Sequence, residues 1–434
     1  MPLRTIIYNF IKEQAEIIKN LVEREAIDIV EWFCYPPHGT VDIKEFADVR
    51  YRLDDAYGDG EKIYDEVFQS FPVFADMHQR RFPYFQNTIY DTWNDFNTQF
   101  GVVHKLLIDT KPDLVLFGNI PHGGHDFLLY KVAKALGIRT LILFQIPICP
   151  RFMILEGIED FGDFCRAPNG TSEKVSDPPV IATPVYMSNV VRKQDSLKKT
   201  LRKIRDPGIG LYALIQRARY NRYKVESAEA VQTLSPDFSY IYFPLHLQPE
   251  MTTSAIGGIY SDQLLAIERL ARKIPDDVQI VVKENPKQTE FQRSQTFYRR
   301  LKMIPNVVLI TANYNTYDLI KGSEFVATIT GTAGWEAINM GKPALVFGKA
   351  WYESLPGVFK YDSSFDFDKM KFCKISKTEL VLAYRRLMCK SWPGIVQSAY
   401  FKLVPGTDVH ENNLTVSDSI EAVMHNPADA KNFR

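Results

Sequence analysis

Long apolar runs, paired cysteines and net charge are all missing from this 434-residue sequence. No apolar run approaches the roughly 20 residues that cross a bilayer, so no membrane span is predicted. The five cysteines are scattered and form no C-x-x-C pair, which argues against a disulfide framework or a zinc site and for a reducing compartment. Basic and acidic residues balance at 52 each, so the chain as a whole shows no attraction for nucleic acid.

The first segment of the chain also lacks the pattern of a signal peptide, because Lys12, Glu13, Glu16 and Lys19 interrupt it. We therefore expect a cytoplasmic protein. An apolar content of 45% with 24% charged residues is typical of a folded globular protein. The length of 434 residues exceeds what one core usually supports and predicts two domains.

Predicted strands and helices alternate in two stretches of the chain, as they do in parallel α/β sheets. In the first stretch, a strand at 113–118 is followed by a helix at 125–136 and a strand at 140–144. The second stretch contains five predicted strands with helices between them, at 240–243, 278–282, 307–310, 325–329 and 344–347. The fold class is therefore α/β, with two Rossmann-like, doubly wound domains.

The same patterns divide the chain into four parts. They are an N-terminal Rossmann-like domain at 1–164, a basic helical insertion or linker at 165–235, a second Rossmann-like domain at 236–404, and a tail or helix at 405–434 that returns to the first domain. Within the insertion, residues 192–224 hold eleven Lys or Arg and only two acidic residues. Such a segment either binds an anionic membrane or acceptor, or is a solvated linker helix.

The most informative segment combines a strand, a turn of small residues, a short helix and a second strand at 325–347. Thr330, Gly331 and Thr332 form the turn, and its backbone N–H groups at a helix N-terminus suit a phosphate. One helical turn later, Glu336 is placed to accept hydrogen bonds from a ribose diol. An ordinary β-α-β crossover, in which Thr332 only caps the helix, explains the same pattern.

Other polar residues follow the strands of the second domain, at the edge where doubly wound sheets bind ligands. His246 and Gln248 come after the first of these strands, and Lys283 and Asn285 after the next. Without a metal, the phosphate charge of a nucleotide leaving group is neutralised by helix N-termini and basic groups. We therefore predict a donor pocket in which His246 or Lys283 supplies the positive charge. A strand-end histidine bonded to backbone is the structural alternative for His246.

A second polar turn, NIPHGGHD at 119–126, follows the clearest strand of the first domain. It places His122, His125 and Asp126 within five positions, with two glycines between the histidines. An attacking hydroxyl needs a general base, and we predict that these residues supply it. Asp126 also suits the first turn of a helix, which is its structural alternative.

Three segments of the second half together resemble the capsule-polysaccharide-biosynthesis family. They are YFPLHLQPE at 242–250, VKENP at 282–286, and TGTAGWE at 330–336 with GKP at 341–343. The first half matches only in its Gly118, Asn119, His122 and Asp126 unit. The resemblance implies a metal-independent GT-B glycosyltransferase without a bound cofactor. Its two domains would face each other across a cleft, and its substrate would be a nucleotide sugar, with CMP-linked ulosonic acids a recurrent donor.

The chain departs from this family pattern at two points. Relatives often carry a His-Pro pair after the second strand, where this chain has Asn285 and Pro286, so Lys283 or His246 is expected to replace that imidazole. Relatives also carry an acidic base in a Glu-Asp-Gly-like segment. The acidic residues near that point here are Glu156, Glu159 and Asp160, and we take Glu156 as the implied candidate.

The residues and the resemblance together predict sugar transfer from a nucleotide donor to a surface polysaccharide, glycolipid or protein. No D-x-D element stands in a suitable strand-end context, in agreement with a metal-free site. The basic segment 192–224 would bring this cytoplasmic enzyme to the inner face of the plasma membrane. Two other enzyme classes share the fold, a non-hydrolysing nucleotide-sugar 2-epimerase and a teichoic-acid-type polyol-phosphate transferase. A non-catalytic carbohydrate-binding GT-B protein is the remaining alternative.

Overall fold

The computed structural model describes residues 1–48, 51, 60–79, 88–162, 239–288, 295–310, 314–402 and 404–425, with single positions at 164, 170, 178, 214, 215, 218 and 293. The predicted basic segment 192–224 lies almost wholly outside the described residues.

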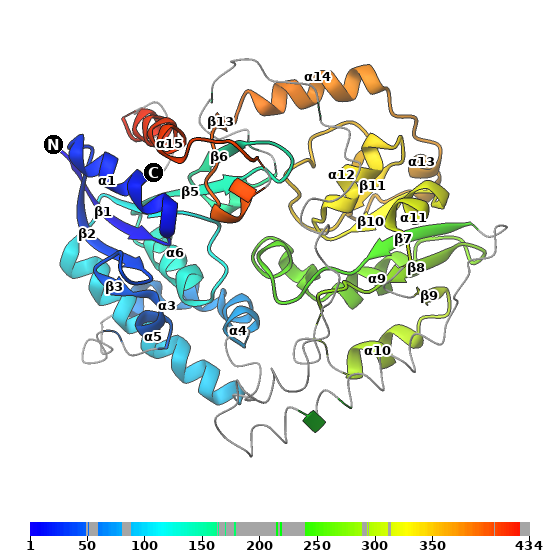
Figure 1. The fold of residues 1–434 in the computed structure, drawn as a ribbon. Coiled ribbons are helices and arrows are strands. Elements are labelled where there is room, and N and C mark those ends of the chain that lie inside the picture. The colour runs from blue at the N-terminus through cyan, green and yellow to red at the C-terminus, as the bar shows by residue number, and fades with distance from the viewer. Residues whose placement is uncertain are drawn as a thin grey trace. The chain divides into compact units, whose positions relative to one another are not determined.

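The chain forms two compact units (Figure 1): unit 1 comprises 1–78, 88–179 and 384–434, and unit 2 comprises 79–87 and 180–383. Each is built on a largely parallel sheet, so the predicted α/β class with two Rossmann-like domains, the plan of GT-B proteins, is confirmed. Their arrangement across a cleft stays a prediction.

The sheet of unit 1 has the strand order β13-β6-β5-β4-β1-β2-β3. Its parallel strands are β1 (Leu3–Tyr8), β2 (Ile27–Cys34), β3 (Val41–Asp42), β4 (Leu114–Phe117) and β5 (Arg139–Gln145). The antiparallel strands β6 (Arg151–Leu155) and β13 (Trp392–Pro393) complete one edge. The direction of winding changes between β1 and β4, and a crevice at such a switch point is where doubly wound sheets bind ligands.

Helices cover the sheet of unit 1. They are α1 (Ala15–Glu23), α2 (Ile43–Ala47), α3 (Glu61–Phe68), α4 (Phe71–Gln79), α5 (Ile89–Thr110), α6 (His125–Ala135) and α15 (Val409–Met424). All four residues of β4 are buried, as expected for a central parallel strand. The start of α5 is set by a capping box, in which Thr88 and Asp91 each bond the other's backbone N–H.

The C-terminal segment belongs to unit 1. Helix α15 packs on α1, and Arg139 donates hydrogen bonds to the last carbonyls of α15, those of Val423 (3.1 Å) and Met424 (3.0 Å). Trp392 of β13 pairs with Phe152 of β6 at the edge of the sheet. The chain consequently returns to unit 1 at Tyr384, earlier than the predicted boundary at residue 404.

The sheet of unit 2 has the order β12-β11-β10-β7-β8-β9, and its strands are all parallel. They are β7 (Tyr240–Pro244), β8 (Gln279–Lys283), β9 (Val307–Ile310), β10 (Val326–Thr328), β11 (Ala344–Val346) and β12 (Val358–Lys360). Counted from β7, this is the 3-2-1-4-5-6 order of the Rossmann fold, with its switch point between β7 and β10.

Alternate side chains of the unit 2 strands enter two separate cores. Ile241 and Val282 belong to the larger core, whereas Tyr242 and Val281 belong to a smaller one beneath α11 and α12. The helices of this unit are α9 (Gln263–Ala271), α10 (Gln295–Lys302), α11 (Thr316–Gly322), α12 (Thr332–Asn339), α13 (Phe367–Lys371) and α14 (Lys377–Met388), which runs on into unit 1. Among all the described helices, none is both long enough and apolar enough to cross a membrane.

Candidate functional site

The switch point of unit 2 brings His246 against the predicted phosphate turn. The imidazole Nε2 of His246, after β7, lies 2.7 Å from the hydroxyl oxygen of Thr328, the last residue of β10. The same hydroxyl accepts the N–H of Gly331 at 3.2 Å. A Cβ on Gly331 would lie 2.9 Å from both His246 Nε2 and Thr328 Oγ1, so only glycine leaves room for this contact. Loops that follow β7 and β10 are therefore joined where a Rossmann sheet binds its ligand.

His246 is a neutral group at this place. Burial, with a smaller effect from the nearby Arg293 guanidinium, lowers the pKa of His246 to about 3. A neutral imidazole cannot offset the charge of a phosphate. Of the two residues that the sequence allowed for the positive role, these electrostatics favour Lys283.

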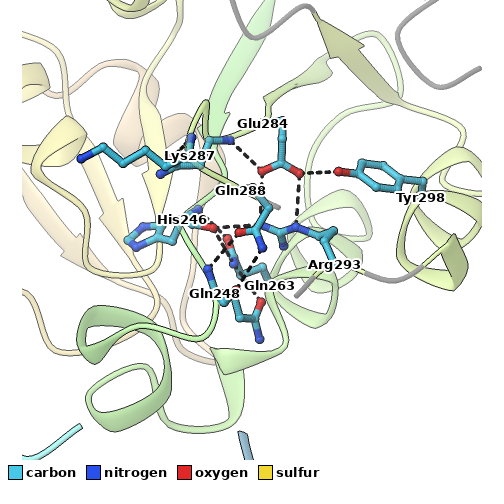
Figure 2. A network of polar contacts seen from close by, with 9 residues as sticks. His246, Gln248, Gln263, Glu284, Lys287, Gln288, Arg293 and Tyr298 are labelled. Atoms are coloured by element: carbon cyan, nitrogen blue, oxygen red, sulfur yellow. Dashed lines mark hydrogen bonds and ion pairs between the residues drawn. The ribbon is translucent and has the colours of Figure 1, made fainter. Parts of the chain in front are cut away.

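A buried polar network fixes the loop that carries His246 and Gln248 (Figure 2). The His246 N–H donates to Gln263 Oε1 at 2.8 Å, and Arg293 donates to the His246 carbonyl at 2.8 Å. Gln288 accepts the Gln248 N–H at 2.9 Å and donates to the Gln248 carbonyl at 3.0 Å. The Gln248 side chain itself donates to the Ser261 carbonyl and accepts from Gln263. Gln248 therefore holds the loop, and its amide is committed within the protein.

The same network contains an ion pair in the interior of unit 2. Arg293 Nε lies 3.2 Å from Glu284 Oε2, and the two side chains are only 1% and 4% exposed. Tyr298 also donates to Glu284 Oε2 at 2.7 Å (Figure 2). The N–H of Asn285 bonds the other carboxylate oxygen, while Asn285 Oδ1 accepts the Lys287 N–H at 2.9 Å. Asn285 thus closes the turn after β8, which gives it a role in shaping the loop.

Lys283 and Tyr317 each interact electrostatically with Glu336, and we term these three residues the Glu336 cluster. Lys283 ends β8 and donates to the Tyr314 carbonyl (2.5 Å) and the Thr316 hydroxyl (2.8 Å). Glu336, in the second turn of α12, is 4% exposed, and its carboxyl accepts no hydrogen bond from any described residue. The buried hydroxyl of Tyr317 also has no hydrogen-bond partner among the residues described. A buried carboxyl and a buried hydroxyl that make no hydrogen bond to a described residue are groups that a ligand can satisfy.

In the Glu336 cluster, the pKa values of Glu336 and Lys283 both lie close to neutral pH. Burial raises the pKa of Glu336 to about 7, against the opposing effect of the Lys283 charge. Burial also lowers the pKa of Lys283 to about 8, against the opposing effect of Glu336. Near pH 7 the Glu336 carboxyl therefore exists in both forms, and it is able to accept or donate a hydrogen bond to a diol. Strongly shifted values at a sheet edge are typical of functional sites.

The turn before α12 has its own internal bonds. The Thr330 hydroxyl donates to the Thr252 carbonyl at 2.6 Å, and the Tyr352 hydroxyl donates to the Gly331 carbonyl. Gly331 is the N-cap of α12 and Thr332 its first residue. The Thr330 side chain therefore shapes the turn, and any capacity to bind phosphate lies in the N–H groups at the start of α12.

In unit 1, the polar turn at 119–126 joins β4 to α6, beside the switch point of that sheet. Asp126 accepts backbone N–H groups from His122 (3.0 Å), Gly123 (2.6 Å) and Phe127 (2.7 Å). It is 5% exposed. We therefore assign Asp126 to holding the turn together, which was its structural alternative. His125 is buried as well, with Nε2 2.6 Å from the Tyr8 hydroxyl.

His122 is the most accessible of the three residues predicted in this turn. Its ring lies partly exposed, and Nδ1 lies 2.6 Å from the Ile120 carbonyl oxygen. Because a carbonyl only accepts, Nδ1 carries the proton, and in the neutral ring Nε2 keeps its lone pair. The His122 side chain is only partly buried, whereas those of His125 and Asp126 are buried.

Glu156 lies at the other edge of the unit 1 sheet. Strand β6 runs antiparallel to β5, so the residue after Leu155 lies near the start of β5, whereas the polar turn follows the end of β4. Both carboxylate contacts of Glu156 are with Arg139, from Nε at 3.2 Å and Nη2 at 3.0 Å. The structure thus does not bring Glu156 together with His122, and it gives Glu156 a structural role beside α15.

Several residues of these sites were not predicted from the sequence. The segments singled out from the sequence do not include Gln263, Gln288, Arg293 or Tyr317. Two others had a signal, because Thr328 stands inside the 325–347 segment and Glu284 inside the VKENP segment. Within the described part of the chain, no group of three or more His, Cys, Asp or Glu residues is arranged to hold a metal ion. Metal independence stays a prediction.

Comparisons with known proteins add a family and several distant structures. Residues 165–392, more than half of the chain, match the model of a family described as capsule polysaccharide biosynthesis protein. The comparison with curated proteins gives no match.

Solved structures that resemble the chain share little sequence with it. The β-Kdo 2,7 transferase of Thermosulfurimonas dismutans KpsC is 12% identical over 88% of this chain and 89% of that one, with a TM-score of 0.36. The β-Kdo 2,4 transferase of the same protein is 14% identical over 62% and 78%, with a TM-score of 0.32. The UDP-GlcNAc 2-epimerase of Neisseria meningitidis, bound to UDP-GlcNAc, is 15% identical over 98% and 100%, with a TM-score of 0.25.

Proposed function

The chain belongs to the capsule polysaccharide biosynthesis family, and from this premise we propose that it is a glycosyltransferase that uses a nucleotide sugar. The donor binds at the carboxyl edge of the unit 2 sheet, and the acceptor is a hydroxyl of a growing surface glycan, glycolipid or glycoprotein. A CMP-linked ulosonic acid is the first donor to test, because the sequence motifs resemble enzymes that use such donors.

The Glu336 cluster is the observation that carries this proposal. A nucleotide has a ribose diol, which can hydrogen-bond to the Glu336 carboxyl. It also has a phosphate, which can pair with the Lys283 ammonium group. Glu336 is 4% exposed and Lys283 is 7% exposed. Lys283 is the last residue of β8, and Glu336 lies in α12, the helix that follows β10, in a sheet with Rossmann order. Two N–H groups of Lys283 are engaged by Tyr314 and Thr316, which leaves a third for an anion.

His122 supplies the general base in this proposal. Its Nε2 removes the proton of the acceptor hydroxyl as that oxygen bonds to the anomeric carbon, and the bond from the sugar to the nucleotide phosphate breaks. The negative charge that develops on the leaving phosphate is stabilised by Lys283 and by the N–H groups at the start of α12. The proposed chemistry is independent of a bound metal.

The test is a thermal-shift screen of CMP-, UDP- and GDP-sugars, followed by a donor-hydrolysis and transfer assay with the donor that binds. A ligand at 100 times its Kd adds about 2.7 kcal/mol of stability, so a true donor gives a clear shift. A protein that binds no nucleotide sugar in this screen would be a non-catalytic carbohydrate-binding member of the fold.

His122→Ala is expected to lower kcat by about 100-fold or more while nucleotide affinity stays within a factor of two or so, because the base touches the acceptor and not the donor. Calorimetry and transfer assays measure the two quantities. His38→Ala, in a loop after β2, is the matched control and keeps wild-type activity. Normal turnover of His122→Ala would exclude this residue as the base. A loss of nucleotide binding instead would favour the epimerase-like alternative.

The basic segment 192–224 is proposed to bring the enzyme to an anionic membrane or a polyanionic acceptor. Its eleven basic and two acidic residues motivate this, although the segment lies almost wholly outside the described residues. Binding to vesicles with anionic lipid is expected to weaken as salt rises, because the Debye length falls from about 30 Å at 0.01 M to about 8 Å at 0.15 M. Co-sedimentation with neutral vesicles is the control. Equal partitioning on both kinds of vesicle would contradict membrane recruitment by charge.

A further inference from the structure

The start of α5 carries large side chains in contact with water. Tyr90 is 76% exposed, Trp93 42% and Ile89 53%. Positions three and four apart share one helix face, so Tyr90 and Trp93 lie in a stripe with Asn94 and Asn97. Tyrosine and tryptophan side chains placed in this way are enriched at binding surfaces. We refer to Tyr90, Trp93, Asn94 and Asn97 as the aromatic platform.

The aromatic platform is held from beneath by other rings. The ring of Trp93 lies 5.1 Å from that of Phe68 and 5.3 Å from that of Phe71. Asn97 Oδ1 accepts a 2.6 Å hydrogen bond from the Tyr64 hydroxyl on α3. The Trp93 ring therefore stands on a packed base, and a ligand that binds it does not have to order it first.

The platform lies at the same edge of the unit 1 sheet as the His122 turn. The far end of α5 is at the opposite edge, where Arg4 of β1 donates to the Thr110 carbonyl at 2.8 Å. Near the platform, Asp95 lies 2.9 Å from His78 Nε2. The backbone nitrogen of His78 lies 3.4 Å from the position that a Cβ on Gly124 would take. Through His78, which interacts with Asp95 and whose backbone comes close to Gly124, the platform helix thus lies near the turn that contains His122.

Charge around the platform distinguishes between two kinds of partner. Residues 61–97 contain six acidic side chains and three Lys or Arg, so the stretch carries an excess of negative charge. This local field repels an anionic lipid surface and an anionic sugar. Carboxylates and amides beside exposed rings instead suit a neutral sugar, because the rings cover its C–H face while the polar groups bond its hydroxyls.

We propose that the aromatic platform binds a neutral segment of the acceptor glycan, next to the turn that carries His122. This inference rests on the proposed function, since it identifies the acceptor side of that reaction. The bound chain is an uncharged run of hexose or N-acetylhexosamine units. Its binding is independent of the nucleotide site in unit 2.

The experiment titrates the full-length protein with neutral glucose and N-acetylglucosamine oligosaccharides, with polysialic acid as an anionic glycan, and with anionic vesicles. Trp93 is the most exposed of the five tryptophans, so its fluorescence reports binding. A neutral oligosaccharide is expected to bind, and Tyr90→Ala to weaken that binding about 5- to 10-fold. Phe372→Ala removes a ring that is 72% exposed in unit 2 and leaves oligosaccharide binding unchanged. CMP or UDP affinity is measured for every variant.

The platform is overturned if the wild type binds no neutral oligosaccharide, or if Tyr90→Ala behaves as Phe372→Ala does. Tyr90-dependent binding to anionic vesicles alone would assign the surface to a membrane instead. Oligosaccharide binding without any nucleotide binding would remove the proposed function and keep a sugar-binding site. Nucleotide binding without oligosaccharide binding would keep the function and remove the platform.

Discussion

Glu336→Gln is expected to weaken binding of the nucleotide about 10- to 100-fold, since a hydrogen bond to a charged group contributes about 1.5–3 kcal/mol. The substitution keeps the shape of the side chain but removes the carboxylate that is proposed to accept the ribose hydroxyls. Calorimetry with CMP, UDP and GDP measures the effect. Glu324→Gln is the matched control, because Glu324 precedes β10 and bonds Ser239 at 2.7 Å, at the opposite edge of the sheet. Equal affinity of wild type and Glu336→Gln for every nucleotide would remove Glu336 from the site.

The same variant has an expected signature in stability. The folded-state pKa of Glu336 is raised from 4.5 to about 7, so the unfolded state releases this proton first as pH rises. As pH rises from 4.5 to about 7, the free energy of unfolding of the wild type therefore falls, by at most about 1.4 kcal/mol per pH unit. The full loss is present above pH 7. Glu336→Gln does not ionise there and is expected to gain stability relative to wild type as pH rises. Parallel pH profiles for the two proteins would contradict the buried, ionising carboxyl.

Arg293→Met is expected to lower the free energy of unfolding of unit 2 by about 3–5 kcal/mol, because it leaves the Glu284 carboxylate buried without its partner. Arg293 also holds the His246 carbonyl, so the loop after β7 is expected to loosen and nucleotide affinity to fall. Thermal unfolding, followed by the fluorescence of the buried Trp335 and Trp351, measures the first effect.

Arg300→Met provides the comparison for that result. Arg300 pairs with Asp262 and Glu268 at 3.2 and 3.0 Å, but its side chain is 40% exposed. Pairs on the surface contribute about 0–1 kcal/mol, so this variant is expected to stay close to wild type. If Arg293→Met and Arg300→Met were equally mild, the interior ion pair would not hold unit 2 together.

The strands and the switch point of unit 2 were predictable because their signals are local. Each strand is a short apolar run, and the residues at its carboxyl end are polar. The segment at 325–347 contains its strand, turn, helix and break within one continuous stretch, and β10, α12 and β11 form there. Position along the chain was enough to place His246 beside the phosphate turn, since parallel strands end at one edge.

The roles of single residues were less predictable, because they depend on partners far away in the chain. A glutamine such as Gln263 looks like a surface residue until the backbone of His246 is known to need both a donor and an acceptor there. The charge of His246 is decided by burial and by Arg293, which no motif marks. Asp126 shows the reverse case, where a helix-start aspartate has its usual structural role although it stands among histidines.

The return of the C-terminal segment to unit 1 has a consequence for the order of folding during synthesis. Unit 2 is built almost entirely from one continuous stretch, 180–383, whereas unit 1 needs β13 and α15 from the last part of the chain. A ribosome has therefore made all of unit 2 before the edge strand of unit 1 and the partner helix of α1 exist. Domains fold as units when their residues are available, so the unit that begins first is the one that is completed last.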